Sequence, residues 1–158
     1  MDSKPTPTAA QAAVRADLLA LQGQLCFALY STMLGVNKVY RSLLRDLDLT
    51  YPQYLVMLAL WERDGINVSE ICEQLFLETT TVTPLLKRLE AQGLVQRDRS
   101  KADERQVIVS LTDAGRALRA KAEGVPGCVA QAMELSPGQI DELRDVLVTL
   151  RASLHKNA

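Results

Sequence analysis

The order of short segments between Val68 and Leu111 constrains the fold more than any other feature of this sequence. Two helices are predicted over Val68–Leu75 and Thr79–Gln92, joined by a connection of three residues. Two strand-like segments follow, Leu94–Arg97 and Gln106–Leu111, on either side of a polar tip. Helix, turn, helix, strand, charged hairpin and strand are the order of a winged helix-turn-helix. We therefore predict a mainly α fold with a small β-hairpin wing.

Pro84 affects where the second of these helices is expected to begin. A proline inside a helix removes a backbone N–H group and costs about 3 kcal/mol unless it lies in the first turn. We therefore expect this helix to begin around Thr80 to Thr83. The preceding threonines would then lie at its exposed N-terminus.

Further helices are predicted on both sides of this region. They cover Ala9–Gln22, Gln24–Asp46, a segment capped by Thr50 that runs to Asp64, Thr112 to about Val129 with a bend near Gly124, and Ser136 to Leu154. The predicted organisation is a disordered tail over residues 1–8, helical regions over 9–49 and 112–158, and a winged helix-turn-helix over 50–111.

The composition shows no overall basic excess, because 18 Lys and Arg stand against 19 Asp and Glu in 158 residues. Hydrophobic residues make up 47% of the chain, which is ample for a buried core. No apolar run approaches the roughly 18 residues that a transmembrane helix needs, and the N-terminus lacks the pattern of a signal peptide. We expect a cytoplasmic protein in which any surface for nucleic acid is local.

The second helix of the predicted motif presents side chains suited to a DNA groove. Threonine hydroxyls can bond phosphates or base edges, and threonine methyls can pack on thymine methyls. Between Lys87 and Arg105, six basic residues stand against four acidic ones. Arg105 is expected to enter the minor groove at the wing, with Asp103 placed to hold its guanidinium. The residues predicted to bind duplex DNA are Thr79, Thr80, Thr81, Thr83, Lys87, Arg88, Arg97, Lys101, Asp103 and Arg105.

Each of these features also has a simpler interpretation. A threonine run before a proline is often only a capped helix start, and a charged hairpin is usually a solvated turn. Only their ordered combination favours binding to DNA.

Several motifs resemble the MarR family of dimeric transcription regulators. They are Leu85–Glu90, Gly93–Val95, and the wing signature Asp103–Arg105 followed by Leu111, Thr112 and Gly115. Within that family, Gln24–Tyr30, Tyr51–Met57 and Thr83–Lys87 are similar to the organic hydroperoxide resistance regulators (OhrR) of the two-cysteine type. The resemblance spans roughly residues 24 to 155. It implies a homodimer, interlocked by its N- and C-terminal helices, that represses genes from pseudopalindromic operators.

The start of the second helix departs from this family pattern. Many relatives carry Asp-Ser-Gly where this chain has Glu78, Thr79 and Thr80. This departure is consistent with an operator sequence that differs from those of such relatives.

The chain has three widely separated cysteines, Cys26, Cys72 and Cys128, and no Cys-x-x-Cys pair. Cys26 and Tyr30 are four residues apart on one helix face, so the phenol can neighbour the sulfur. Tyr40 lies fourteen residues after Cys26, about 21 Å further along a straight helix. It cannot touch the Cys26 of its own chain.

The family resemblance assigns these residues a redox role. It implies that Tyr40 and Tyr51 of the other subunit hydrogen-bond the Cys26 thiolate, which attacks an organic hydroperoxide. The resulting sulfenic acid would condense with Cys128 of the partner subunit, and the disulfide would release the operator. The simpler interpretation is that the cysteines are buried small hydrophobic residues, which we accept for Cys72.

Two alternative functions remain at this point. One is a MarR-type repressor that senses a small phenolic ligand in the dimer cleft, without redox chemistry. The other is a thiol peroxidase acting through Cys26 and Cys128, but the helix-turn-helix and its wing have no purpose in such an enzyme. We predict no enzymatic activity and no cofactor. We also predict no metal site, because the single histidine, His155, is expected to be solvated and the cysteines lack zinc-site spacing.

Overall fold

The computed structural model describes residues 19–158, which belong to two compact units, one ending at Val39 and one running from Tyr40 to Ala158. The first unit contains the 3-10 helix η1 (Leu21–Gly23) and most of helix α2 (Leu25–Leu43). The predicted tail over residues 1–8 and the start of the predicted Ala9–Gln22 helix lie outside the described residues. The described end of that predicted helix is a turn followed by η1. Within residues 19–158, no helix is long and apolar enough to cross a membrane.

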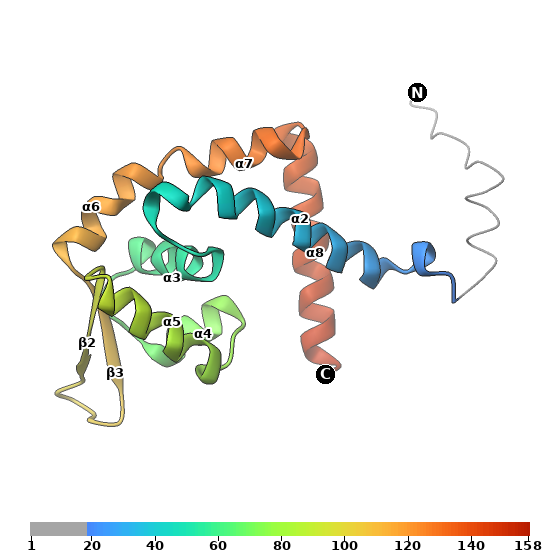
Figure 1. Cartoon of the computed structure of the whole chain (residues 1–158). Helices are drawn as coiled ribbons and strands as arrows, with labels where there is room; N and C mark the ends of the chain where they lie inside the picture. The colour runs from blue at the N-terminus through green and yellow to red at the C-terminus, as the bar shows by residue number, and fades with distance from the viewer. Residues whose placement is uncertain (1–18) are drawn as a thin grey trace. The chain divides into compact units, whose positions relative to one another are not determined.

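The core of the second unit is formed by three helices that follow the 3-10 helix η2 (Arg45–Leu47). They are α3 (Tyr51–Glu62), α4 (Val68–Leu75) and α5 (Thr79–Ala91), and each packs against the other two (Figure 1). Their contacts are aliphatic and almost completely buried, through Val56, Met57, Leu60, Ile71, Val82, Leu86 and Leu89. This burial confirms the predicted helix-turn-helix, with α5 as its second helix.

Two of these helices begin with the capping chemistry that their sequences carry. The Thr50 hydroxyl accepts the backbone N–H of Gln53, and the Gln53 side chain accepts the N–H of Thr50 in return. Asn67 and Glu70 form the same reciprocal pair at the start of α4. Both helix starts are therefore specified locally.

Helix α5 begins at Thr79, earlier than the predicted start between Thr80 and Thr83. The carbonyl of Glu78 accepts the N–H groups of Thr81 and Val82, so the first turn is complete before Pro84 is reached. Pro84 then lies inside the helix and leaves only the Thr80 carbonyl without its usual donor. Thr80 is exposed, so water can reach that carbonyl.

A three-stranded antiparallel sheet with the order β1-β3-β2 stands beside the helices. Strands β2 (Val95–Arg99) and β3 (Val107–Leu111) form the predicted wing, whose hairpin projects beyond α5 in Figure 1. Strand β1 (Ile66–Asn67) pairs with β3, with Ile66 opposite Val109. The sequence did not predict β1, because two residues are too few to show an alternating pattern. Ile66 and Asn67 form a strand because they pair with β3.

The C-terminal part consists of α6 (Asp113–Ala122), α7 (Val125–Met133) and α8 (Pro137–Lys156). The predicted single helix from Thr112 to Val129 is therefore two helices, which separate at Gly124. Pro126 lies in the first turn of α7, where its missing N–H group costs nothing. Ser136 caps α8 as expected, through a reciprocal pair with Gln139.

The wing is joined to the helices at a tight junction around Gly115. The Thr112 side chain donates to the carbonyl of Gly93 at 2.6 Å and accepts the N–H of Gly115 at 3.0 Å. The Trp61 indole N–H donates to the Gly115 carbonyl at 2.9 Å. A Cβ atom at position 115 would lie 2.0 Å from the backbone oxygen of Leu94. Only glycine fits this position without moving the strand.

We predict that Gly115→Ala lowers the free energy of unfolding by about 1–3 kcal/mol, because the added methyl overpacks a backbone contact. Urea denaturation at a fixed protein concentration measures the effect. Gly138→Ala is the matched control, since a Cβ at position 138 meets nothing within 4 Å. Equal stability of the two variants would contradict the tight junction.

Candidate nucleic-acid interface and thiol site

The predicted DNA-contacting threonines lie on the first turns of α5. Thr79, Thr80 and Thr81 are exposed, and Thr83 is half-buried. Glu78, the residue before the helix, makes no side-chain capping hydrogen bond within the described chain. The first backbone N–H groups of α5 therefore remain available beside the threonine hydroxyls, an arrangement that suits phosphate oxygens.

A cavity of about 260 Å³ separates this end of α5 from the wing. It brings together four residues predicted from the sequence, which are Thr79, Thr83, Arg97 and Arg105. Ser69 of α4 and Gln106 of the wing also line it, and neither was predicted from the sequence. Their exposure to the same cavity depends on the turn between α4 and α5 and on the hairpin register. The cavity therefore lies between α5 and the wing, and side chains of both elements line it.

Arg97 differs from the other predicted DNA-binding cations because it is paired within the chain. Its Nη2 atom lies 2.5 Å, and its Nε atom 3.0 Å, from one carboxylate oxygen of Glu90. These hydrogen bonds from Arg97 hold the pKa of Glu90 below its usual value. Arg97 consequently ties β2 to α5, and its charge is balanced before any DNA arrives.

Asp103 holds the wing tip in a different way from the one predicted. Its carboxylate accepts the backbone N–H of Arg105 at 3.1 Å, rather than the guanidinium, and it also lies 3.5 Å from the side-chain amide of Gln106. In the described part of the chain, Arg105 takes part in none of the ion pairs. The exposed cations of this face are therefore Lys87, Arg88, Arg99, Lys101 and Arg105.

We predict that Arg105→Ala weakens binding to duplex DNA by about tenfold or more and lowers the salt slope of binding by about one. The reason is the loss of an unpaired cation at the end of the wing. Fluorescence anisotropy at several salt concentrations measures both quantities. Arg144→Ala, which removes an exposed cation from α8, is the control. An unchanged affinity for Arg105→Ala would contradict the assignment of the wing.

Tyr40 and Tyr51, which were predicted from the family resemblance, lie side by side in the second unit. Their ring centroids are 4.1 Å apart and stacked. Tyr54, one turn further along α3, lies 5.8 Å from Tyr40 and 6.3 Å from Trp61, so the four rings form a row. The sequence prediction missed Tyr54, although its spacing of three from Tyr51 places both on one helix face.

Burial raises the pKa of these phenols still further above neutral pH. It is the main cause that raises the pKa of Tyr40 to about 12, with smaller contributions from the neighbouring Tyr51 and Tyr54. Burial also raises the pKa of Tyr51, and burial followed by Tyr51 raises that of Tyr54. At neutral pH each hydroxyl is a hydrogen-bond donor, the form that can stabilise an anion such as a thiolate.

We predict that the free energy of unfolding falls as the pH rises from 10 to 12. A phenol with the ordinary pKa of 10.0 ionises in the unfolded chain before Tyr40 ionises in the folded one, which favours unfolding. Denaturation across this range, with absorbance at 295 nm to follow ionisation, measures the effect. Tyr40→Phe is expected to show a smaller fall, and an identical fall would contradict the raised pKa.

The three cysteines are free thiols in different settings. Cys26, in the first turn of α2, and Cys128, in α7, are both exposed in the single chain, which disagrees with their being buried hydrophobic residues. Tyr30, one turn after Cys26, is also exposed. Cys72 is only half-buried, and its sulfur lies 3.7 Å from the Thr79 hydroxyl. Within residues 19–158, no group of His, Cys, Asp or Glu could hold a metal ion.

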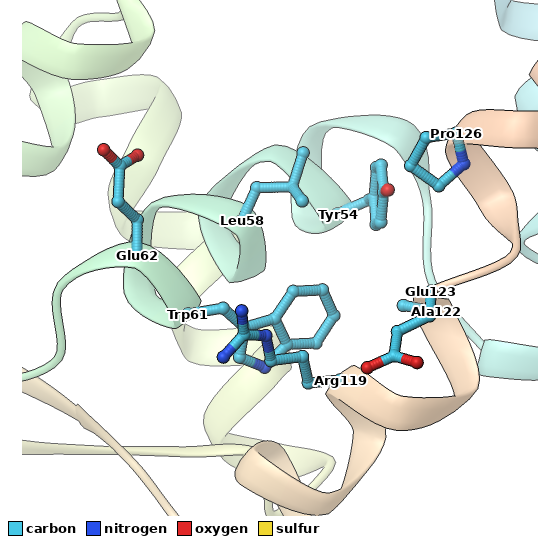
Figure 2. Close-up of a pocket in the computed structure, with 8 residues that line it drawn as sticks. All are labelled: Tyr54, Leu58, Trp61, Glu62, Arg119, Ala122, Glu123 and Pro126. Carbon is cyan, nitrogen blue, oxygen red and sulfur yellow. The ribbon is translucent and has the colours of Figure 1, made fainter. Parts of the chain in front are cut away.

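A larger cavity of about 500 Å³ lies next to the tyrosine row. Figure 2 shows Tyr54, Leu58 and Trp61 of α3 across from Ala122, Glu123 and Pro126 of the α6–α7 segment. Arg119, Glu62 and Glu123 add charge to a lining whose other residues are apolar or aromatic. This cavity could not be predicted from the sequence, because its walls come from helices about 60 residues apart.

Comparison with known proteins agrees with the fold. Residues 38–121 match the family model described as transcriptional regulator SarA/Rot. This match and the fold define a winged-helix transcriptional regulator, a DNA-binding protein and not an enzyme. The chain belongs to the MarR-like winged-helix family that this model describes.

Two curated relatives are similar over most of their length. The organic hydroperoxide resistance transcriptional regulator of Bacillus subtilis (strain 168) is 44% identical over 140 residues, which cover 89% of this chain and 95% of the relative. The HTH-type transcriptional regulator TtmR of Methylorubrum extorquens (strain PA1) is 47% identical over 144 residues, which cover 91% of this chain and 74% of the relative.

Among solved structures, AbfR of Staphylococcus epidermidis is similar in more than one form. Reduced AbfR bound to DNA has a TM-score of 0.76 at 34% identity and covers 86% of this chain and 93% of that one. The disulfide form has a TM-score of 0.62 at 35% identity, with coverage of 89% and 98%.

Proposed function

We propose that this protein is a homodimeric repressor that binds duplex operator DNA and releases it when an organic hydroperoxide oxidises Cys26. The observation that carries this proposal is the pair of stacked, protonated tyrosines, Tyr40 and Tyr51. Two phenol donors side by side suit an anion that arrives from outside the second unit. The 44% identity to an organic hydroperoxide resistance regulator supports a peroxide-derived signal.

The DNA-binding step uses α5 in the major groove and the wing beside it. The exposed threonines at the start of α5 would contact base edges and phosphates, and Lys87 and Arg88 would contact the backbone. Arg105 at the hairpin would reach the minor groove. The DNA-bound structure of AbfR, at 34% identity, supports this assignment.

The homodimer is supported by apolar side chains that a single chain leaves exposed. On α8 they are Leu143, Val146, Leu147 and Leu154, and on α2 they are Leu25, Met33 and Leu34. A second copy of the chain would bury both sets, at roughly 25 cal/mol for each Å² of apolar surface removed from water. Two copies would also present two α5 helices to the two halves of a palindromic operator.

The sensor would combine residues of two subunits. Helix α2 is continuous from Leu25 to Leu43, and residues fourteen positions apart on such a helix are separated by about 21 Å. Tyr40 therefore serves the Cys26 thiolate of the partner and not its own. Tyr30, one turn from Cys26, would complete the group of phenols around the sulfur.

The redox chemistry proceeds in two steps, the oxidation of Cys26 and the formation of a disulfide. The Cys26 thiolate attacks the terminal oxygen of the hydroperoxide, the O–O bond breaks, and the alcohol leaves after taking up a proton. Sulfur is thereby oxidised to sulfenic acid while the peroxide is reduced. The Cys128 thiolate of the partner then attacks this sulfur and displaces hydroxide, which leaves as water, to form a disulfide. The disulfide would favour a dimer that binds the operator less tightly.

We predict that stoichiometric cumene hydroperoxide releases the reduced parent protein from a duplex that it has selected from a random-sequence pool. Cys26→Ser is expected to bind this duplex normally and to remain bound after oxidant. Cys128→Ser is expected to lose the oxidant-induced dimer band on a non-reducing gel, and Cys72→Ser serves as the control. Release of Cys26→Ser at the parent's peroxide concentration would show that the redox proposal is wrong.

The 500 Å³ cavity favours one alternative, a repressor that responds to a small phenolic ligand. Its aromatic and apolar walls suit a ring, and Arg119, which lines it together with Glu62 and Glu123, is the cation that a negative group would contact. Release of DNA-bound Cys26→Ser by a phenolic carboxylate such as salicylate would support this alternative, and Trp61→Ala should then abolish the response.

A further inference from the structure

Phe76, in the turn between α4 and α5, has a backbone conformation that is unfavourable for an aromatic residue. Its φ is 55° and its ψ is 39°, the left-handed region that a helix end usually fills with glycine. The conformation ends α4, because the N–H of Leu77 bonds back to the carbonyl of Cys72 at 3.0 Å. Glycine would meet this backbone requirement at lower cost, so the ring at position 76 needs another explanation.

The ring is half exposed, and the last turns of α8 lie against it. The guanidinium carbon of Arg151 lies 4.0 Å from the centroid of the Phe76 ring, a distance typical of a cation–π contact. The His155 ring, which is exposed as predicted, lies 5.2 Å away and is a second neighbour of Phe76. Arg151 and His155 are four positions apart and share one face of α8.

Arg151 contacts the Phe76 ring and does not pair with a carboxylate of the described residues. It is absent from the ion pairs of residues 19–158, whereas Arg144, two turns earlier on α8, pairs with Asp141 and Asp145. The charge of Arg151 therefore faces the ring. Because the turn leads directly into α5, whatever holds Phe76 also limits where Thr79 can lie.

We propose that Arg151 and Phe76 are positioning residues that hold the turn, and with it the start of α5, against the end of α8. This inference rests on the proposed DNA binding and goes beyond it, since α8 is otherwise assigned only to the dimer. It also gives α7, which carries Cys128 and precedes α8, a mechanical connection to the DNA-contacting helix. Operator affinity is then set in part by residues that do not touch DNA.

The test is the affinity of Arg151→Gln for the duplex that the parent protein selects from a random-sequence pool. Loss of the cation is expected to weaken binding by about two- to fivefold, the equivalent of a cation–π contact. Arg151→Lys retains a cation and is expected to keep most of the affinity. Phe76→Leu should weaken binding as Arg151→Gln does, and the double variant should be no weaker than either single one. Arg144→Gln is the control on the same helix.

Two further measurements separate a positioning role from other roles. The salt slope of Arg151→Gln should equal that of the parent, because a residue that touches no phosphate releases no counterion. A lower slope, or an affinity equal to the parent's, would overturn the proposal. Amide hydrogen exchange of the free dimer should be faster at Leu77 in Arg151→Gln than in Arg144→Gln. If the parent selects no duplex, the proposed function fails, and this exchange comparison alone decides whether Arg151 holds the turn.

Discussion

The backbone contact between Gly115 and Leu94 is the constraint on which the rest of the second unit depends. The Leu94 carbonyl accepts the N–H of Thr112, and Gly115 passes so close to that carbonyl that a side chain is excluded. The same segment takes hydrogen bonds from Thr112 to Gly93 and from Trp61 to Gly115. Strand β2, helix α3 and helix α6 are thereby joined at one point, which determines where the wing stands relative to α5.

In the wing, which we propose contacts DNA, only some of the charged side chains are paired within the chain. A chain with a net charge of −1 cannot attract DNA through its overall field. Glu90 balances Arg97 and ties β2 to α5, while Asp103 binds the backbone of the hairpin tip, and Arg105 forms no ion pair with the other residues from 19 to 158. The local basic excess therefore comes from structure as well as from composition.

The tyrosine row and the α8 contact bring residues from distant parts of the sequence to two separate places. Tyr40 meets Tyr51 and Tyr54 where the end of α2 lies beside the start of α3, and burial raises the pKa of these phenols. Arg151 meets Phe76 through the return of α8 toward the helix-turn-helix, along the red helix of Figure 1. The tyrosine row suits the detection of a chemical signal, and the Arg151–Phe76 contact suits the transmission of that signal to α5.

Local chemistry explains what could be predicted from the sequence. Features that depend on neighbours a few positions away could be predicted. They are the capping residues Thr50 and Ser136, the helix periodicity and the wing strands. The two-residue strand β1, the Glu90–Arg97 pair, the role of Asp103, the place of Tyr54 and the Arg151–Phe76 contact could not be predicted. These features require residues from different elements to meet, and only the packing of those elements determines which ones do.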